Sequence, residues 1–151
     1  LAIHADGSLQ RFSPGEGRRT SHAPRQPQTV VRMNGHPIHS GFPLRWRTPD
    51  LEIYQYVRGA AENLQIISYA YDAPTQMNWP IEWVVQYGKG RTYGATFGHI
   101  GKQDPKDDAL RCVGVQTVVI RALQWLAHRK VDWPLPQDFP SETTLRTRPG
   151  Q

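Results

Sequence analysis

The residues of this sequence best suited to chemistry include a histidine at the end of a strand-like run. His99 follows Gly98, and the glycine would allow a ligand to approach closely. In open α/β sheets, ligands collect beyond the carboxyl ends of strands, often beside a helix N-terminus. A histidine there can act as a general acid or base, bind a sugar hydroxyl or ligate a metal. It can equally well fix a loop or cap a helix.

Three further residues could join this histidine. Glu52 and Tyr54 are two positions apart in an alternating run, so both side chains lie on one strand face. A carboxylate beside a phenol can orient a histidine or bind a polyol, although the solvent-facing side of an edge strand has the same pattern. His4 ends a short apolar run and would line the same cleft if its strand is a neighbour; an incidental position near the chain end is the alternative. We therefore predict His99 and Glu52 as catalytic residues, and His4 and Tyr54 as substrate-binding residues.

Three other motifs are weaker candidates. His36 and His39 flank Pro37 in a loop and lack the helical spacing of a metal-binding pair, so we predict no metal site. Residues 88–90, Gly-Lys-Gly, lack the helix and the Ser or Thr of a phosphate loop, and a hairpin turn fits better. Cys112 falls on a predicted helix rather than at a nucleophile elbow, which favours a structural thiol.

The elements that must position these residues are several strands followed by a long helix. The strand-like runs are residues 1–5, 28–33, 51–56 and 64–71, together with 81–87 and 91–97, which flank the glycine-bracketed turn of an antiparallel hairpin. Asp104 can cap a helix that has Pro105 at its first position. An apolar stripe with helical spacing runs from Val115 to Leu126. Prolines after residue 131 end helical structure, and residues 141–151 are expected to form a loose tail.

Length and composition indicate one ordinary globular domain. The chain has 151 residues, of which 38% are hydrophobic and 21% charged. No apolar run reaches the roughly 18 residues of a membrane span. The start shows no signal peptide, so we expect a cytoplasmic protein; the first residue is not Met, however, and a protein that has lost a leader would be secreted. A single cysteine excludes an internal disulfide.

The excess positive charge is concentrated in the first third of the chain. The net charge is +5; residues 1–49 carry seven arginines against Asp6 and Glu16, and the remainder is neutral. A basic segment can bind nucleic acid, but no lysine-rich helix or aromatic-interleaved strand accompanies this one. Solvated loop charge is the favoured interpretation, and nucleic acid is not an expected partner.

Several motifs, in order, resemble the trehalose-utilisation (ThuA-like) family. Residues 83–91 (Trp-Val-Val-Gln-Tyr-Gly-Lys-Gly-Arg), Gly98-His99, and residues 111–116 with Trp125 resemble the C-terminal half of that family. The upstream matches are His36-Pro37-Ile38, Gly41-Phe42-Pro43 and Glu52-Ile53-Tyr54, which resemble a His-Pro-Ile turn followed by an Asp-Glu-Leu-Tyr strand, as well as His4 at an earlier strand end and the proline-bearing segment 134–140. The resemblance covers about residues 28 to 140.

This resemblance implies a fold and a function. The fold would be a flavodoxin-like three-layer α/β sandwich of the glutamine-amidotransferase-like superfamily, with a mostly parallel sheet and an antiparallel hairpin. Residues 1–140 would form the C-terminal two thirds of the family domain. The implied role is in sugar and disaccharide catabolism, with a carbohydrate derivative bound or transformed in a cleft at the carboxyl ends of the strands.

Three departures from the family pattern support a different function. Leu51 stands where the family usually has the Asp of Asp-Glu-Leu-Tyr. The strand-helix units that precede His4 in the family have no counterpart here, so the chain is either a fragment of a longer protein or a divergent, shortened domain. No cysteine occupies a nucleophile elbow. The alternative is a non-catalytic interaction or scaffold domain. The sequence leaves open whether the chain is an enzyme, which cofactor it would use and whether it forms a homo-oligomer; the expected partner is a small carbohydrate-like ligand.

Overall fold

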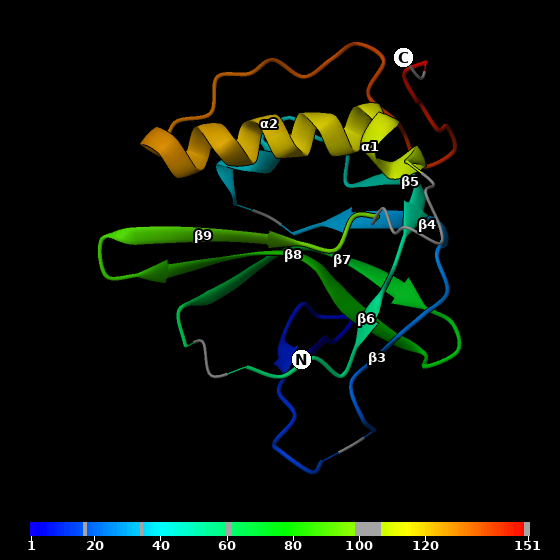
Figure 1. Ribbon diagram of the computed structural model, residues 1–151, viewed down its shortest axis with the longest axis vertical. Helices are drawn as coiled ribbons and strands as arrows, with labels where there is room; N and C mark the ends of the chain where they lie inside the picture. The colour runs from blue at the N-terminus through cyan, green and yellow to red at the C-terminus, as the bar shows by residue number, and fades with distance from the viewer. Residues whose placement is uncertain (17, 34, 60–61, 99–106, 150–151) are drawn as a thin grey trace.

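The computed structural model is built around a twisted antiparallel sheet, and in the part of the chain that it describes two α-helices follow the last strand (Figure 1). It describes residues 1–16, 18–33, 35–59, 62–98 and 107–149. The strands are β1 (Ala2–Ile3), β2 (Leu9–Gln10), β3 (Ser21–His22), β4 (Gln26–Arg32), β5 (Arg45–Leu51), β6 (Tyr54–Gln55), β7 (Leu64–Asp72), β8 (Met77–Tyr87) and β9 (Gly90–Ala95).

The long strand β8 organises the main sheet. The strand order is β2-β1-β8-β7-β4-β5, and β9 also pairs with β8. One edge of β8 pairs with β7, and the other pairs first with β1 at Asn78 and then with β9 from Glu82 onward. The hairpin predicted around residues 88–90 is confirmed, with Tyr87 opposite Gly90. Strands β3 and β6 form a separate two-stranded ribbon.

The expectation of a mostly parallel flavodoxin-like sandwich is wrong. Every strand pair in the described residues is antiparallel. A parallel pair needs a crossover of a dozen or more residues, usually a helix between the two strands. The only helix of the described residues before β9 is the three-residue 3-10 helix η1 (Pro37–His39), which leads into the antiparallel partner of β4.

The two α-helices are α1 (Asp108–Arg111) and α2 (Val113–His128). They are separated at Cys112, whose ψ of 125° is extended. Helix α2 ends at His128, before the prolines that were expected to end it, and Arg129 follows in a left-handed conformation with φ 62°. The predicted caps Asp104 and Pro105 lie outside the described residues. No helix in the described residues is long and apolar enough to cross a membrane.

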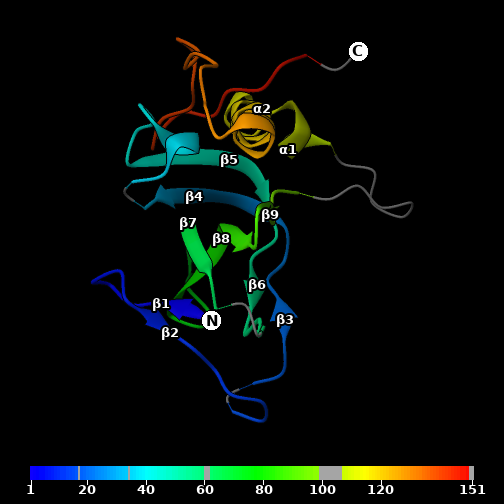
Figure 2. The same cartoon turned by 90° about the vertical axis from the view of Figure 1, so that its left-hand side faces the viewer.

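Helix α2 covers one side of the molecule, where it contacts η1, β5 and β9, and β3 and β6 lie on the other side of the main sheet (Figure 2). The core between these layers includes Trp46 and Trp79, both fully buried. The C-terminal segment, expected to be a loose tail, hydrogen-bonds to the start of the helices. The amide of Val113 donates to the carbonyl of Arg146, and the amide of Arg148 donates to that of Arg111.

Candidate functional site

A buried carboxylate links a histidine to a tyrosine where β5 leads into β6. Glu52 lies directly after β5 and its side chain is 8% exposed. Its Oε1 lies 2.9 Å from Nδ1 of His22, whose side chain is 58% exposed. Burial and the hydrogen bond to Glu52 raise the pKa of Tyr54 above its ordinary value of 10. The imidazole of His22 and the phenol of Tyr54 therefore both contact the carboxylate of Glu52.

The pairing of β3 with β6 places these two rings together. His22 is directly opposite Tyr54 in this antiparallel ribbon, and directly opposite residues share a face. The two ring centroids are 6.1 Å apart. The amide of Ala23 donates to the carbonyl of Ile53 at 2.8 Å, which joins the two chain segments next to Glu52. The backbone thus fixes the geometry of the His22–Glu52–Tyr54 cluster.

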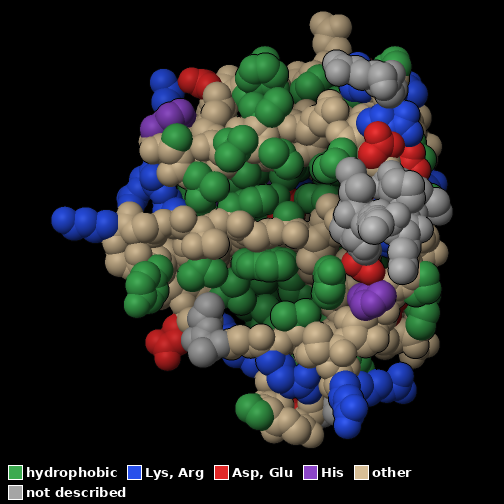
Figure 3. All heavy atoms as spheres, in the orientation of Figure 1, with side chains coloured by type: hydrophobic (Ala, Val, Ile, Leu, Met, Phe, Trp, Pro, Cys, Tyr) green, Lys and Arg blue, Asp and Glu red, His purple; other side chains and the backbone are tan. Residues whose placement is uncertain are grey.

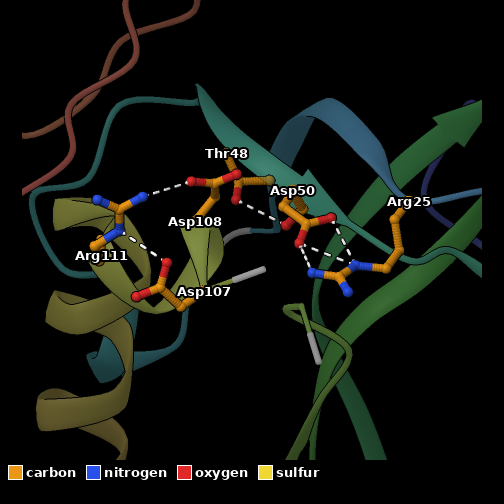
Figure 4. A network of polar contacts seen from close by, with 6 residues as sticks. All are labelled: Arg25, Thr48, Asp50, Asp107, Asp108 and Arg111. Carbon is orange, nitrogen blue, oxygen red and sulfur yellow. Dashed lines mark hydrogen bonds and ion pairs between the residues drawn. The ribbon is translucent and has the colours of Figure 1, made fainter. Parts of the chain in front are cut away.

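A second set of charges lies two residues before Glu52 (Figure 4). Nε of Arg25 donates to both carboxylate oxygens of Asp50, at 3.1 and 3.0 Å, and both side chains are nearly buried. A Cβ added at Gly98 would lie 3.8 Å from Oδ2 of Asp50, so the described end of the Gly98-His99 motif adjoins this ion pair. On the helix side, Arg111 pairs with Asp107 and Asp108. All three carboxylates are therefore paired with arginines of this chain.

Tyr54 also lines a cleft of about 540 Å³. Most of its lining is apolar, from Leu64, Ile66, Pro80, Trp83 and Val85 among others. Polar groups at its edge come from Arg11, Arg58 and Thr96. Hydrophobic side chains gather in a hollow below β9 on the face seen in Figure 3. A largely apolar cleft with a few convergent polar groups is the usual form of a small-molecule site.

Trp83 forms an aromatic wall of this cleft. It lies opposite Gly94 in the β8–β9 pairing. A Cβ at Gly94 would come within 2.5 Å of the indole Cε2 and Nε1, so the missing side chain lets the indole lie directly over β9. Thr96 is 8% exposed, and within the described chain its buried Oγ1 has no hydrogen-bond partner. The cleft therefore offers an aromatic surface and an unsatisfied hydroxyl.

The predicted site residues have different positions in the structure. Glu52 and Tyr54 are brought together as expected from their spacing. His99 lies outside the described residues. His4 is exposed in the turn between β1 and β2, where its amide donates to the carbonyl of Ser8, and it lines neither of the described pockets.

Sequence reasoning missed His22, Thr96 and the particular role of Trp83. His22 lies 30 residues before Glu52 and carries no motif, so only the β3–β6 pairing reveals it. Trp83 and Gly94 belong to the two strands of the predicted hairpin, and they lie opposite each other in it. That register could have suggested an indole packed over a glycine.

A third polar cluster lies under α2, away from the cleft. Glu82 is fully buried and its carboxylate accepts hydrogen bonds from Ser68 at 2.5 Å and Tyr93 at 2.8 Å. Nε2 of His39 lies 3.0 Å from Oε2 of Glu82. Three partners thus compensate a carboxylate removed from water, as burial of a charge requires. This cluster belongs to the packing between η1 and the sheet.

The described residues contain no group of three or more His, Cys, Asp or Glu side chains that could hold a metal ion. His36 uses its Nδ1 to accept a hydrogen bond from the amide of Ile38, and His39 is paired with Glu82. Cys112 is buried, and burial raises the pKa of its thiol, which disfavours the reactive thiolate.

Comparison with known proteins gives one informative match. No family model matches the chain, and no curated protein matches it. A crystal structure of a protein described as ThuA-like, from Parabacteroides merdae, is 30% identical and superimposes with a TM-score of 0.84. The match covers 97% of this chain and 54% of that one, so the chain spans about half the length of the solved protein. The chain accordingly shares its fold with part of a ThuA-like protein.

Proposed function

We propose that this chain is a ThuA-like domain that binds a carbohydrate or sugar derivative in the cleft between Tyr54 and Trp83. The observation that carries the proposal is the composition of that cleft: an aromatic and aliphatic wall bordered by hydroxyl and guanidinium groups. A sugar ring has apolar C–H faces and a hydroxylated rim, which match such a wall and such a border. The resemblance to ThuA-like proteins supports the same ligand class.

The polar groups at the edge of the cleft would have different roles in binding. The phenol of Tyr54 is held by Glu52, which fixes its position at the edge of the cleft. The unsatisfied Oγ1 of Thr96 is available to a ligand hydroxyl. Arg58 donates to the backbone carbonyls of Ser13, Glu16, Arg18 and Tyr56, so its N–H groups also hold the preceding loop in place. Binding would combine stacking on the apolar wall with hydrogen bonds at the polar edge of the cleft.

The test is a titration of the full chain with glucose, galactose, trehalose, maltose and sucrose, followed by isothermal calorimetry and by tryptophan fluorescence. We expect at least one sugar to bind and Trp83→Ala to abolish that binding. The matched control is Trp133→Ala, because Trp133 is 44% exposed and lies outside the cleft. The proposal fails if no sugar binds, or if Trp83→Ala binds as well as the wild type does.

A further inference from the structure

We propose that His22 is a general acid–base group of this site, oriented by Glu52, and that it exchanges a proton with a hydroxyl of the bound ligand. The identity of that ligand as a polyol rests on the proposed function; the state of the imidazole does not. The hydrogen-bond partners of the two ring nitrogens define that state.

The surroundings of Nδ1 determine which nitrogen carries the proton in the neutral ring. Nδ1 lies 2.9 Å from Oε1 of Glu52 and 3.3 Å from the carbonyl oxygen of Ala23. A carboxylate and a carbonyl can only accept hydrogen bonds, so Nδ1 must be the donor. The lone pair of the neutral imidazole is then on Nε2, which has no protein partner among the described residues. More than half of the side chain is exposed, so Nε2 can meet a ligand.

Glu52 is itself held firmly enough to orient the ring. Its side chain is almost fully buried and accepts a hydrogen bond from Tyr54 as well as from His22. A buried carboxylate on Nδ1 fixes the tautomer and the ring orientation, and it stabilises the imidazolium that forms when Nε2 takes a proton. An exposed histidine paired with a buried carboxylate is the arrangement that general acid–base catalysis uses.

The position of His22 connects it to the cleft. Tyr54 lines the cleft and lies directly opposite His22 on the same face of the β3–β6 ribbon. His22 is not itself among the residues that line the cleft, but its ring centroid lies 6.1 Å from that of Tyr54, so a ligand that extends past Tyr54 reaches the imidazole.

The proton moves between the ligand hydroxyl and Nε2 of His22. A ligand O–H bond breaks while an Nε2–H bond forms, which leaves an alkoxide and an imidazolium, and Glu52 remains ionised throughout. Return of the proton to oxygen restores the neutral ring. Glu52 is a positioning residue in this scheme because it acts only through His22.

The first experiment determines the tautomer in the wild-type chain by nitrogen-15 NMR at a pH where the ring is neutral. Free imidazole in histidine mostly carries its proton on Nε2, so a predominance of the Nδ1–H form at His22 is the expected and distinctive result. A predominant Nε2–H form would overturn the proposal without any variant being needed.

The second experiment measures reactivity with diethyl pyrocarbonate, which modifies an unprotonated ring nitrogen, with peptide mass spectrometry to locate each modified histidine. We expect His22 to react several-fold faster than the exposed His4, which serves as an internal control. In Glu52→Gln the rate at His22 should fall to that of His4, while the rate at His4 is unchanged. Equal rates at both histidines in the wild type, or an unchanged His22 rate in Glu52→Gln, would contradict the orienting role.

Adding the sugar that binds in the titration separates the two proposals. Protection of His22, with His4 still reactive, places the imidazole at the ligand. A sugar that binds without protecting His22 overturns its acid–base role but leaves the binding function intact. If no sugar binds, the proposed function fails, whereas the tautomer and the reactivity still decide whether the His22–Glu52 pair has the proposed state.

Discussion

At the scale of single residues, the packing of Trp83 against β9 requires a residue without a side chain at Gly94. The position of a Cβ at Gly94 is already occupied by the indole. Gly94→Ala should therefore displace Trp83 from the cleft wall. Inserting a methyl group into a filled space costs about 1–3 kcal/mol of unfolding free energy. We expect a shift in tryptophan fluorescence, a loss of unfolding free energy in urea and weaker sugar binding.

Gly59→Ala is the matched control for the stability measurement. A Cβ at Gly59 meets nothing within 4 Å, and surface changes of this kind usually alter stability by no more than about 0.5 kcal/mol. If Gly94→Ala is as stable as Gly59→Ala and keeps its fluorescence, the indole does not depend on the glycine.

The sequence predicts only the local part of the site. The spacing of Glu52 and Tyr54 suggests one face of a continuous strand; the structure brings both to one cluster, although Glu52 lies between β5 and β6 rather than in a strand. The third member, His22, depends on a pairing between segments 30 residues apart, and periodicity contains no information about such a partner. The cleft also depends on contacts between distant segments, because its wall combines β7, β8 and β9 with the loop after β6.

At the scale of elements, α2 approaches β5 through Gly114. A Cβ there would lie 2.5 Å from Cζ3 of Trp46 and 2.9 Å from Cγ of Pro140. Helix propensity alone would favour Gly114→Ala by about 1 kcal/mol. We expect the opposite, because Trp46 is fully buried and cannot move away freely. The substitution should lower the unfolding free energy by about 1–3 kcal/mol, as measured by urea denaturation.

Leu123→Ala provides the comparison on the same helix. Leu123 is 60% exposed, so its removal takes little apolar surface from the core, and alanine is a good helix former. Its unfolding free energy should stay within about 0.5 kcal/mol of the wild type. A stabilising effect of Gly114→Ala would show that the helix does not need this close approach.

The sequence predicts individual elements better than their arrangement. The alternation and the glycine turn predict the β8–β9 hairpin, and the run at residues 64–71 corresponds to β7. The apolar stripe predicts α2, but not the interruption at Cys112. The parallel sheet came from the resemblance to a longer domain, whereas the elements themselves contain no strand-helix-strand unit among the described residues. The residues themselves predict antiparallel pairing only for the hairpin formed by residues 81–87 and 91–97.

At the scale of the whole molecule, two groups between α2 and the sheet contribute to the dependence of stability on acid. Burial, and then the nearby His39, lower the pKa of His36 from 6.5 to about 4. Burial tends to raise the pKa of Glu82, but the charge of His39 and hydrogen bonds from His39, Ser68 and Tyr93 bring it below 4.5. Both groups favour their deprotonated form in the folded chain.

The sign of the effect is the same for both groups. Between about pH 6.5 and 4 the unfolded chain binds a proton at His36 that the folded chain does not bind, so stability falls as the pH is lowered through this window. Below pH 4.5 the unfolded chain also protonates Glu82 before the folded chain does, and stability falls further. We expect the free energy of unfolding in urea to be greatest above pH 6.5.

The contribution of His36 to the pH dependence of stability can be removed while the capping hydrogen bond at this position is kept. His36 caps η1 by accepting a hydrogen bond from the amide of Ile38, and asparagine is a good cap that does not titrate. His36→Asn should therefore flatten the dependence of unfolding free energy on pH between 6.5 and 4, while the decline below pH 4.5 from Glu82 remains. His4→Asn, at an exposed position, should keep the wild-type slope. An unchanged slope in His36→Asn would mean that protonation at other sites, rather than at this buried imidazole, destabilises the fold in mild acid.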